Sequence, residues 1–338
     1  MSALAERCAT ASEHAVVARL RVDLYMALSQ PDRAVSVGLG YLRRLGIDWS
    51  GHPGDDEVRR EYERVWSRLG SRAIEELFDL PLMTDAVALA TLDLLIALMP
   101  AAFFTDANLR SLVVLKAVDL SLEWGHSDAS CVPYVMFGAI AGARFGDYQA
   151  GIRFSSIGIE LVERRGLSRV QARTYLNYGN LVLTWTKHLR HGRDAFRRAF
   201  EIANGSGDVT FASFSCASLN VNFLAAGDPL SEAQREAEYG VQFAEKANFA
   251  LLVDIMMPQL GLIRMLRGLT RRFGAFDDGQ FDELAFERRL SADPAFALPE
   301  SWYWIRKLQA RFFSGEYALA VDAASKARRL PWSPPQLF

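Results

Sequence analysis

The stretch Ala143-Arg144-Phe145-Gly146-Asp147-Tyr148 predicts a turn between two helices. The first helix ends in apolar residues, and Gly146 can adopt the left-handed backbone conformation that terminates a helix. Tyr148 follows two positions after that glycine, and the small residue Gly151 comes five positions after it. A small residue at this point lets two paired helices approach closely, and the tyrosine fills the space beside it. The stretch therefore predicts a tightly packed helix hairpin.

The stretch Ala310–Tyr317 repeats the pattern nearer the other end of the chain. Its glycine is Gly315, its tyrosine is Tyr317, and its small residue is Ala320. This shared spacing resembles the Gly-x-Tyr-x-x-Ala pattern of tetratricopeptide repeats. The standard repeat is about 34 residues long. Because the units here are longer and less regular, we expect hairpins that are tetratricopeptide-like.

Helical periodicity extends along almost the whole chain, and no run with the period of two that marks a strand is longer than a few residues. From residue 129 onward, hairpins start near residues 129, 168, 208, 249 and 297, a spacing of about 40 residues for three steps; a fixed period in this range indicates a helical solenoid. The predicted helices are 3–28, 31–45, 55–77, 84–100, 106–125, 129–145, 147–165, 168–188, 191–204, 208–226, 231–247, 249–273, 279–290, 297–314 and 316–329.

The composition is that of an ordinary soluble globular protein. Of 338 residues, 50% are hydrophobic and 23% are charged, and the net charge is −2. Nucleic-acid binders usually carry a strong basic excess, so we expect no nucleic-acid partner. The most apolar segment, 86–104, contains Asp93 at its centre, which favours a buried core helix over a membrane span. The first residues do not have the pattern of a signal peptide, and we expect a cytoplasmic protein.

The motifs that carry common chemistry are absent. The sequence has no Gly-Lys pair and hence no phosphate-binding loop. It also has no His-Glu-x-x-His pair, which would bind zinc, and no Gly-x-Ser-x-Gly turn, which would hold a nucleophilic serine. We therefore expect no catalytic residue, no metal ligand and no cofactor. The stretch Leu252–Pro258 is similar to the phospho-acceptor segment of a receiver domain, centred on Asp254. The acidic pair and the lysine of a receiver are missing around it, which favours a helix that is kinked or started at Pro258.

The densest aromatic cluster is Trp302-Tyr303-Trp304. Adjacent residues of a helix point in different directions, so the three side chains cannot all face one core. Core packing accounts for most of the run, and an exposed member of it would be a candidate interaction surface, because Trp and Tyr are enriched at binding hot spots.

Five stretches together carry a resemblance to a known family; they are Ala34–Ile47, Leu77–Met83, Val118–Ser127, Phe145–Tyr148 and Gly227–Leu230. They resemble segments of very large signalling proteins that join a serine/threonine kinase domain, a predicted signalling ATPase, a long helical repeat region, a GAF domain and a sensor histidine kinase. The resemblance implies that this chain is the helical repeat region, and none of the family's catalytic motifs lies in it.

These observations predict an all-α, right-handed α-solenoid of tetratricopeptide-like hairpins. We expect residues 1–338 to form a single array, with a first hairpin at 1–50, irregular helices at 55–125 and regular hairpins at 129–329. The expected function is non-catalytic: the array binds a protein partner or neighbouring signalling domains and couples them to kinase or ATPase output. Two alternatives remain open. One is a sensor that binds a small molecule in the concave groove, and the other is an enzyme built around Asp93 or Asp254.

Overall fold

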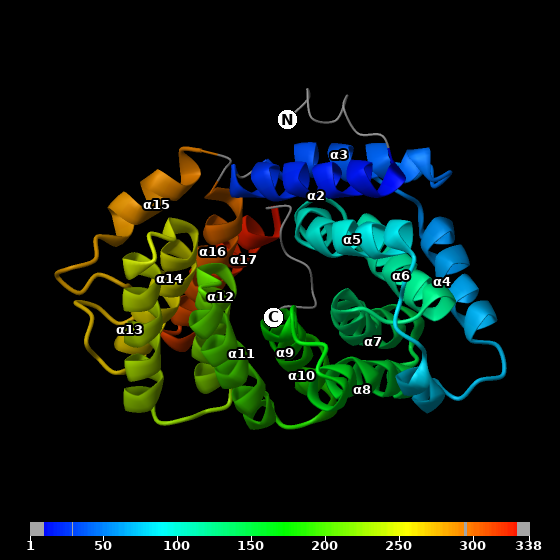
Figure 1. Ribbon diagram of the computed structural model, residues 1–338. Coiled ribbons are helices and arrows are strands. Elements are labelled where there is room, and N and C mark those ends of the chain that lie inside the picture. The colour runs from blue at the N-terminus through cyan, green and yellow to red at the C-terminus, as the bar shows by residue number, and fades with distance from the viewer. Residues whose placement is uncertain (1–9, 29, 294–295, 330–338) are drawn as a thin grey trace. The chain divides into compact units, whose positions relative to one another are not determined.

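The computed structural model describes residues 10–28, 30–293 and 296–329, and within them the protein is all-α (Figure 1). Sixteen α-helices and a few short 3₁₀ or π turns form the regular structure of this described part. The expected all-α fold is confirmed. The chain divides into two compact units, Met1–Val182 and Leu183–Phe338. That the two units continue one array of hairpins stays a prediction.

The first unit contains eight α-helices and two 3₁₀ turns in its described residues. In chain order they are α2 (Ala11–Ala27), α3 (Pro31–Arg44), α4 (Asp55–Leu69), η1 (Ile74–Asp79), α5 (Ala86–Thr105), α6 (Ala107–Trp124), η2 (Asp128–Ser130), α7 (Cys131–Phe145), α8 (Tyr148–Arg165) and α9 (Gln171–Tyr178). Helices that follow each other in sequence pack as pairs, namely α2 with α3, α5 with α6, and α7 with α8. The helix α4 lies on α6, and η1 lies on α8.

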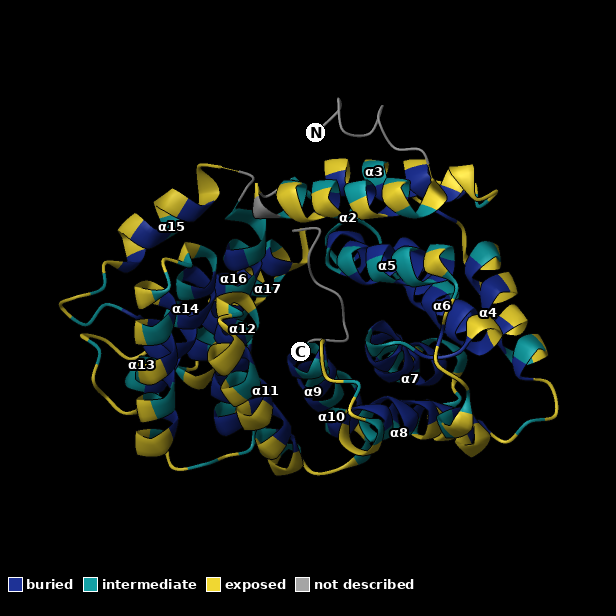
Figure 2. Ribbon diagram, in the orientation of Figure 1, coloured by how far each residue is buried: buried dark blue, intermediate teal, exposed yellow. Residues whose placement is uncertain are grey.

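The second unit continues with paired helices. They are α10 (Thr184–Thr186), η4 (Leu189–His191), α11 (Gly192–Ser206), α12 (Val209–Ala225), α13 (Leu230–Lys246), α14 (Ala250–Leu266), α15 (Glu283–Ser291), α16 (Ala297–Phe313) and α17 (Tyr317–Arg329). Consecutive helices α11 to α14 pack on one another, and α16 packs on α17. Alternate helices also meet, because α12 contacts α14 and α14 contacts α16. Buried residues line the facing sides of these helices, and exposed residues cover their outer sides (Figure 2).

The hairpin of α7 and α8 contains the stretch Ala143–Tyr148, whose glycine forms the turn between the two helices. Gly146 ends α7 with φ +74°, in the left-handed conformation that glycine adopts without strain. Gly151 touches the backbone of the facing helix, since a Cβ added to it would lie 2.6 Å from the carbonyl oxygen of Gly138. A Cβ on Gly158 would lie equally close, 2.6 Å from the carbonyl oxygen of Cys131. Gly138, Gly151 and Gly158 thus bring the backbones of α7 and α8 into direct contact.

Three predicted helices differ from the structure at residues with unusual backbone conformation. The helix predicted over 55–77 ends at Leu69, because Gly70 has φ +63°, and the chain resumes as the 3₁₀ turn η1. The helix predicted over 249–273 ends at Leu266, ahead of Gly268 with φ +71°. The helix predicted over 168–188 is shorter and is interrupted by a π turn, η3 (Gly179–Leu183). The predicted residues 3–9 lie outside the described residues.

Proline does not end the two most apolar helices. Pro100 lies inside α5 and Pro258 lies inside α14, so the interpretation that a helix starts at Pro258 was wrong. α5 is long and apolar enough to cross a membrane, with a mean hydropathy of 2.1 over 18 residues, and 61% of that window is buried. In the first unit α5 packs against α2, α3 and α6. A mostly buried helix of this kind is typical of the core of a globular unit.

Candidate functional site

The predicted repeat positions lie at two helix turns, with different environments. In the first turn, Tyr148 is half-exposed, and its ring covers Gly142, where an added Cβ would lie 2.6 Å from the tyrosine ring. In the second turn, Gly315 has φ +77°, and Ala320 is buried in α17. Tyr317 is 62% exposed there, and its ring lies 5.7 Å from the ring of Phe312. Both turns therefore contain a left-handed glycine followed by a tyrosine, whereas Tyr317 covers no glycine of the described residues.

The aromatic run on α16 is divided between the core and the surface. Tyr303 is fully buried and Trp304 is 5% exposed, while Trp302 is partly buried. Both buried rings belong to the hydrophobic core of the second unit, together with Phe276 and Phe286. Tyr303 and Trp304 thus belong to the core, as the sequence predicts for most of the run, and only a small part of Trp304 remains accessible, where it lines a groove.

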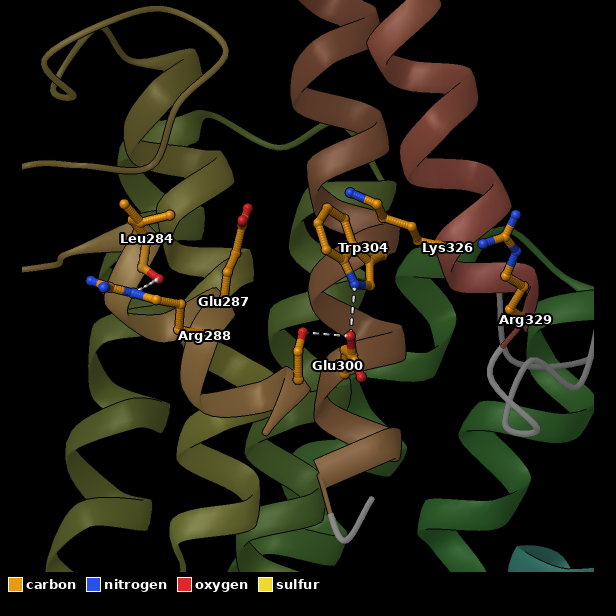
Figure 3. A pocket seen from close by; sticks show the side chains of 8 residues that line it. Leu284, Glu287, Arg288, Glu300, Trp304, Lys326 and Arg329 are labelled. Atoms are coloured by element: carbon orange, nitrogen blue, oxygen red, sulfur yellow. Dashed lines mark hydrogen bonds between the residues drawn. The ribbon is translucent and has the colours of Figure 1, made fainter. Parts of the chain in front are cut away.

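A groove lies beside Trp304 in the second unit (Figure 3). We call it the α15–α17 groove, because three helices line it, and its volume is about 420 Å³. In Figure 3 Leu284, Glu287 and Arg288 of α15 lie on one side of it and Trp304 and Lys326 on the other. The Arg288 guanidinium turns back along α15, where its Nε donates to the carbonyl oxygen of Leu284 at 3.3 Å. The lining residues are Leu284, Glu287, Arg288, Ser291, Glu300, Trp304, Lys326 and Arg329.

Hydrogen bonds hold the floor of the groove in place. The indole nitrogen of Trp304 donates to Glu300 at 3.2 Å, and the Ser291 hydroxyl donates to the same carboxylate at 3.0 Å. The Lys326 ammonium lies 4.2 Å from the centroid of the Trp304 ring, within the range of a cation–π contact. These contacts tie α15, α16 and α17 together around one aromatic side chain.

A buried ionic network lies directly behind the groove. Lys307 donates to Glu283 at 2.5 Å and to the carbonyl oxygen of Gly274 at 3.0 Å, and both charged side chains are less than a tenth exposed. The hydroxyl of Tyr303 lies within hydrogen-bond distance of Glu283, at 2.8 Å, and of Glu287. Burial, together with the two carboxylates, raises the pKa of Tyr303 well above its ordinary value. A phenol has one proton, so Tyr303 can donate to only one of the two carboxylates at a time.

Two of the three cations that line the groove, Arg288 and Arg329, have no acidic partner within the described residues, whereas Lys326 pairs with Asp322 at 3.1 Å. Glu287 and Glu300 are engaged with side chains of the unit itself. Among the described residues, no carboxylate lies within ion-pair distance of Arg288 or Arg329. Both arginines are exposed. The groove therefore presents an aromatic and aliphatic wall with a positive rim, which suits a ligand or segment that combines apolar and anionic groups.

Asp254 is an ion-pair partner inside a helix. It lies in α14 and is 6% exposed, and Arg289 donates to both of its oxygens, at 2.9 and 2.5 Å. A receiver domain places its phospho-acceptor at the end of a strand, in a cluster of acidic side chains. The helix and the bidentate arginine contradict that alternative, and they leave Arg289 occupied rather than available to the groove.

Two of the stretches that carry the family resemblance pair with each other in the first unit. The backbone of His126 bonds to Pro81 and Met83, each at 2.8 Å, and its Nε2 donates to the carbonyl oxygen of Leu77 at 2.7 Å. Gly125 has φ +94°, and an added Cβ would lie 2.2 Å from the carbonyl oxygen of Pro81. These motif residues therefore serve packing between segments that are far apart in sequence.

His126 makes the stability of this junction depend on pH. Burial lowers the pKa of His126 to about 4, whereas the unfolded imidazole titrates near ~6.5. The unfolded chain therefore binds a proton that the folded chain excludes. The contribution of His126 to the free energy of unfolding is therefore complete above pH ~6.5. It is lost as the pH falls toward 4, by about 3 kcal/mol in total.

The variant His126→Gln keeps an amide donor toward Leu77 and removes the titration. Urea unfolding at pH 7 and at pH 4 is the measurement. The stability difference between wild type and variant should shrink by about 3 kcal/mol at the lower pH, since only the wild type loses this contribution. Parallel pH profiles for the two proteins would show that His126 is accessible to protons in the folded state.

Comparison with known proteins gives a distant relative in signal transduction. No protein-family model matches the chain. The chain is similar to the hybrid signal transduction histidine kinase G of Dictyostelium discoideum, with 22% identity over 267 residues. The match covers 73% of this chain and 8% of the relative, so the chain spans a small part of that protein. The chain is thus an all-helical region related to part of a signal-transduction histidine kinase.

Proposed function

We propose that this chain is a non-catalytic interaction module of a signal-transduction protein, and that the α15–α17 groove holds part of its partner. The observation that carries the proposal is the composition of the groove: Trp304 and Leu284 form an apolar wall, and Arg288 and Arg329 stand at its rim without an acidic partner among the described residues. The relationship to a histidine kinase supports the setting in signal transduction.

The finer placement in a signalling protein is part of the proposal. We infer that the chain corresponds to the helical repeat region between an ATPase and a GAF–histidine kinase part, in the cytoplasm. We also infer that its hairpins stack as a right-handed α-solenoid of tetratricopeptide-like units. Within the second unit, the contacts of α12 with α14 and of α14 with α16 support stacking of successive hairpins. Such an array derives its stability mainly from contacts between neighbouring repeats.

A module without chemistry regulates by binding one state of its target better than another. The buried pair Lys307–Glu283 and the Tyr303 hydroxyl fix α15 and α16 on either side of the groove. A partner segment that fills the groove would therefore contact three helices held at a fixed spacing. Its binding would lower the population of any conformation in which the helices have a different spacing.

A small-molecule sensor is a second candidate, and the size of the groove favours it. Its volume of about 420 Å³ lies within the range of ~300–1,000 Å³ typical of ligand pockets. Native mass spectrometry of the protein purified from its own host distinguishes the two candidates. A bound small molecule that is lost from the variant Leu284→Asp supports the sensor.

Site-specific photo-crosslinking tests the proposed partner site. A photoreactive amino acid replaces Leu284, which is 60% exposed in the groove, and in a matched control it replaces Leu269, which is 49% exposed outside it. Crosslinking in cells of the native host should join the Leu284 position to a protein or domain of a kinase signalling system, and the control should give no such product. Equal products from both positions would contradict a partner site at the groove.

A further inference from the structure

The helix α2 has apolar side chains on two opposite sides. One side is buried in the first unit and carries Ala15, Ala18 and Val22. The other side carries large apolar residues spaced four apart, and the C-cap residue of the helix continues the stripe. Each of the four side chains is between 43% and 55% exposed: Val16, Leu20, Leu24 and the C-cap residue Leu28. Isolated exposed leucines are normal, but a continuous apolar stripe on a surface helix marks an interaction site.

A groove between α2 and α3 runs beside this stripe. Its volume is about 310 Å³, and its apolar lining includes Val17, Val37 and Tyr41. Its charged lining is entirely basic, because it contains Arg21, Arg44 and His14 and no carboxylate. We call the stripe and the groove together the α2–α3 surface.

The arginines of the α2–α3 surface have no acidic partners within the described residues. The Arg44 guanidinium donates to Nε2 of His14 at 3.0 Å, and no carboxylate lies within ion-pair distance of Arg44 or Arg21. The neighbouring arginines differ, because Arg19 pairs with Asp23 at 3.2 Å and Arg43 pairs with Asp48 at 2.8 Å. The two arginines that line the groove, Arg21 and Arg44, thus keep their positive charge unpaired.

The spacing of the apolar stripe and the charge of the arginines in the groove indicate which kind of partner the α2–α3 surface binds. A ridge of side chains four residues apart is the surface that one helix offers to the groove of another helix. Unpaired arginines beside it favour a partner with carboxylates at matching positions. An anionic membrane is a poorer match: α2 carries as many carboxylates, Glu13 and Asp23, as arginines, whereas membrane-surface helices are rich in basic residues.

We propose that the α2–α3 surface docks an acidic amphipathic helix of a partner protein, with its apolar side chains on the Val16–Leu28 stripe and its carboxylates on Arg21 and Arg44. This site lies in the first unit and is independent of the α15–α17 groove.

The test is selection of binding peptides from a displayed random library with the full chain as bait. A parallel selection uses the variant Arg21→Glu/Arg44→Glu. The control Arg59→Glu/Arg60→Glu makes the same change of charge at two exposed positions of α4 in the same unit. The peptides from the wild type should combine Asp or Glu with apolar residues four apart. They should bind the groove variant at least ~10-fold more weakly and the control within about twofold.

The apolar stripe is tested with Leu20→Ser/Leu24→Ser, two exposed positions where a folded variant is expected and is checked by its circular dichroism. The same peptides should bind it at least ~10-fold more weakly. Selected peptides without an acidic bias, or peptides that bind the Arg21 and Arg44 variant as well as wild type, would overturn the proposal. Flotation with phosphatidylserine vesicles that is abolished by the serine variant would overturn it in favour of a membrane surface.

Discussion

Neutralising Glu283 should destabilise the second unit by about 3–5 kcal/mol, because it leaves the ammonium of Lys307 buried without a counter-charge. The Lys307 side chain is 5% exposed, so water cannot replace the lost carboxylate. The variant Glu283→Gln keeps the shape of the side chain, which separates loss of charge from loss of packing. Urea unfolding followed by fluorescence measures the change.

A double-mutant cycle identifies the ion pair as the cause. Lys307→Met removes the other charge and keeps an unbranched side chain of similar length. Removing both charges should cost less than the sum of the two single changes, by about 1–3 kcal/mol, because the double variant has no unpaired charge. Additive losses would mean that Glu283 and Lys307 act through separate contacts, and that the network behind the α15–α17 groove is not coupled.

Adding one methyl group at Gly151 should cost about 3 kcal/mol. The new Cβ of Gly151→Ala would lie 2.6 Å from the carbonyl oxygen of Gly138, a backbone atom that cannot move without separating α7 from α8. The matched control is Gly40→Ala. Gly40 is exposed inside α3 with no atom within 4 Å, so alanine there should stabilise the helix by about 0.5–1 kcal/mol. The measurement is thermal unfolding of both variants.

The two glycine variants should change the melting temperature in opposite directions. A similar change at both positions would show that helix propensity, rather than the close approach of α7 and α8, governs the effect. An unchanged stability of Gly151→Ala would mean that the hairpin tolerates a wider separation of its helices than the structure has.

Local signals in the sequence predict most of the helices and turns. Gly146 and Gly315 end helices as expected, because a left-handed glycine is a local requirement of the backbone. The spacing also identifies Gly151 as a point of close approach, but not Gly138 as its partner. That pairing depends on how two helices dock, which is a property of the tertiary structure. For the same reason, the sequence did not show that η1 separates from α4 after Gly70.

The candidate site is harder to predict than the fold. The sequence predicted core packing for most of the aromatic run on α16, and two of its three rings lie in the core. It did not show which ring would reach a groove. The signal that could have found the ionic network is the spacing of four between Tyr303 and Lys307, and between Glu283 and Glu287, which places each pair on one helix face. That these two faces meet follows from the packing of α15 on α16, for which the sequence carries no local sign.

We propose that this chain acts by binding a partner through the α15–α17 groove. The most direct test is the affinity of the purified chain for the protein or domain recovered by crosslinking at Leu284. The variant Arg288→Glu/Arg329→Glu reverses both unpaired charges at the rim, and Arg328→Glu reverses an exposed charge on α17 that does not line the groove.

The double variant should bind at least ~10-fold more weakly, with an unchanged melting temperature, and the affinity of Arg328→Glu should stay within about twofold of wild type. Equal affinities of wild type and both variants, measured by titration calorimetry, would show that the partner does not bind at the α15–α17 groove.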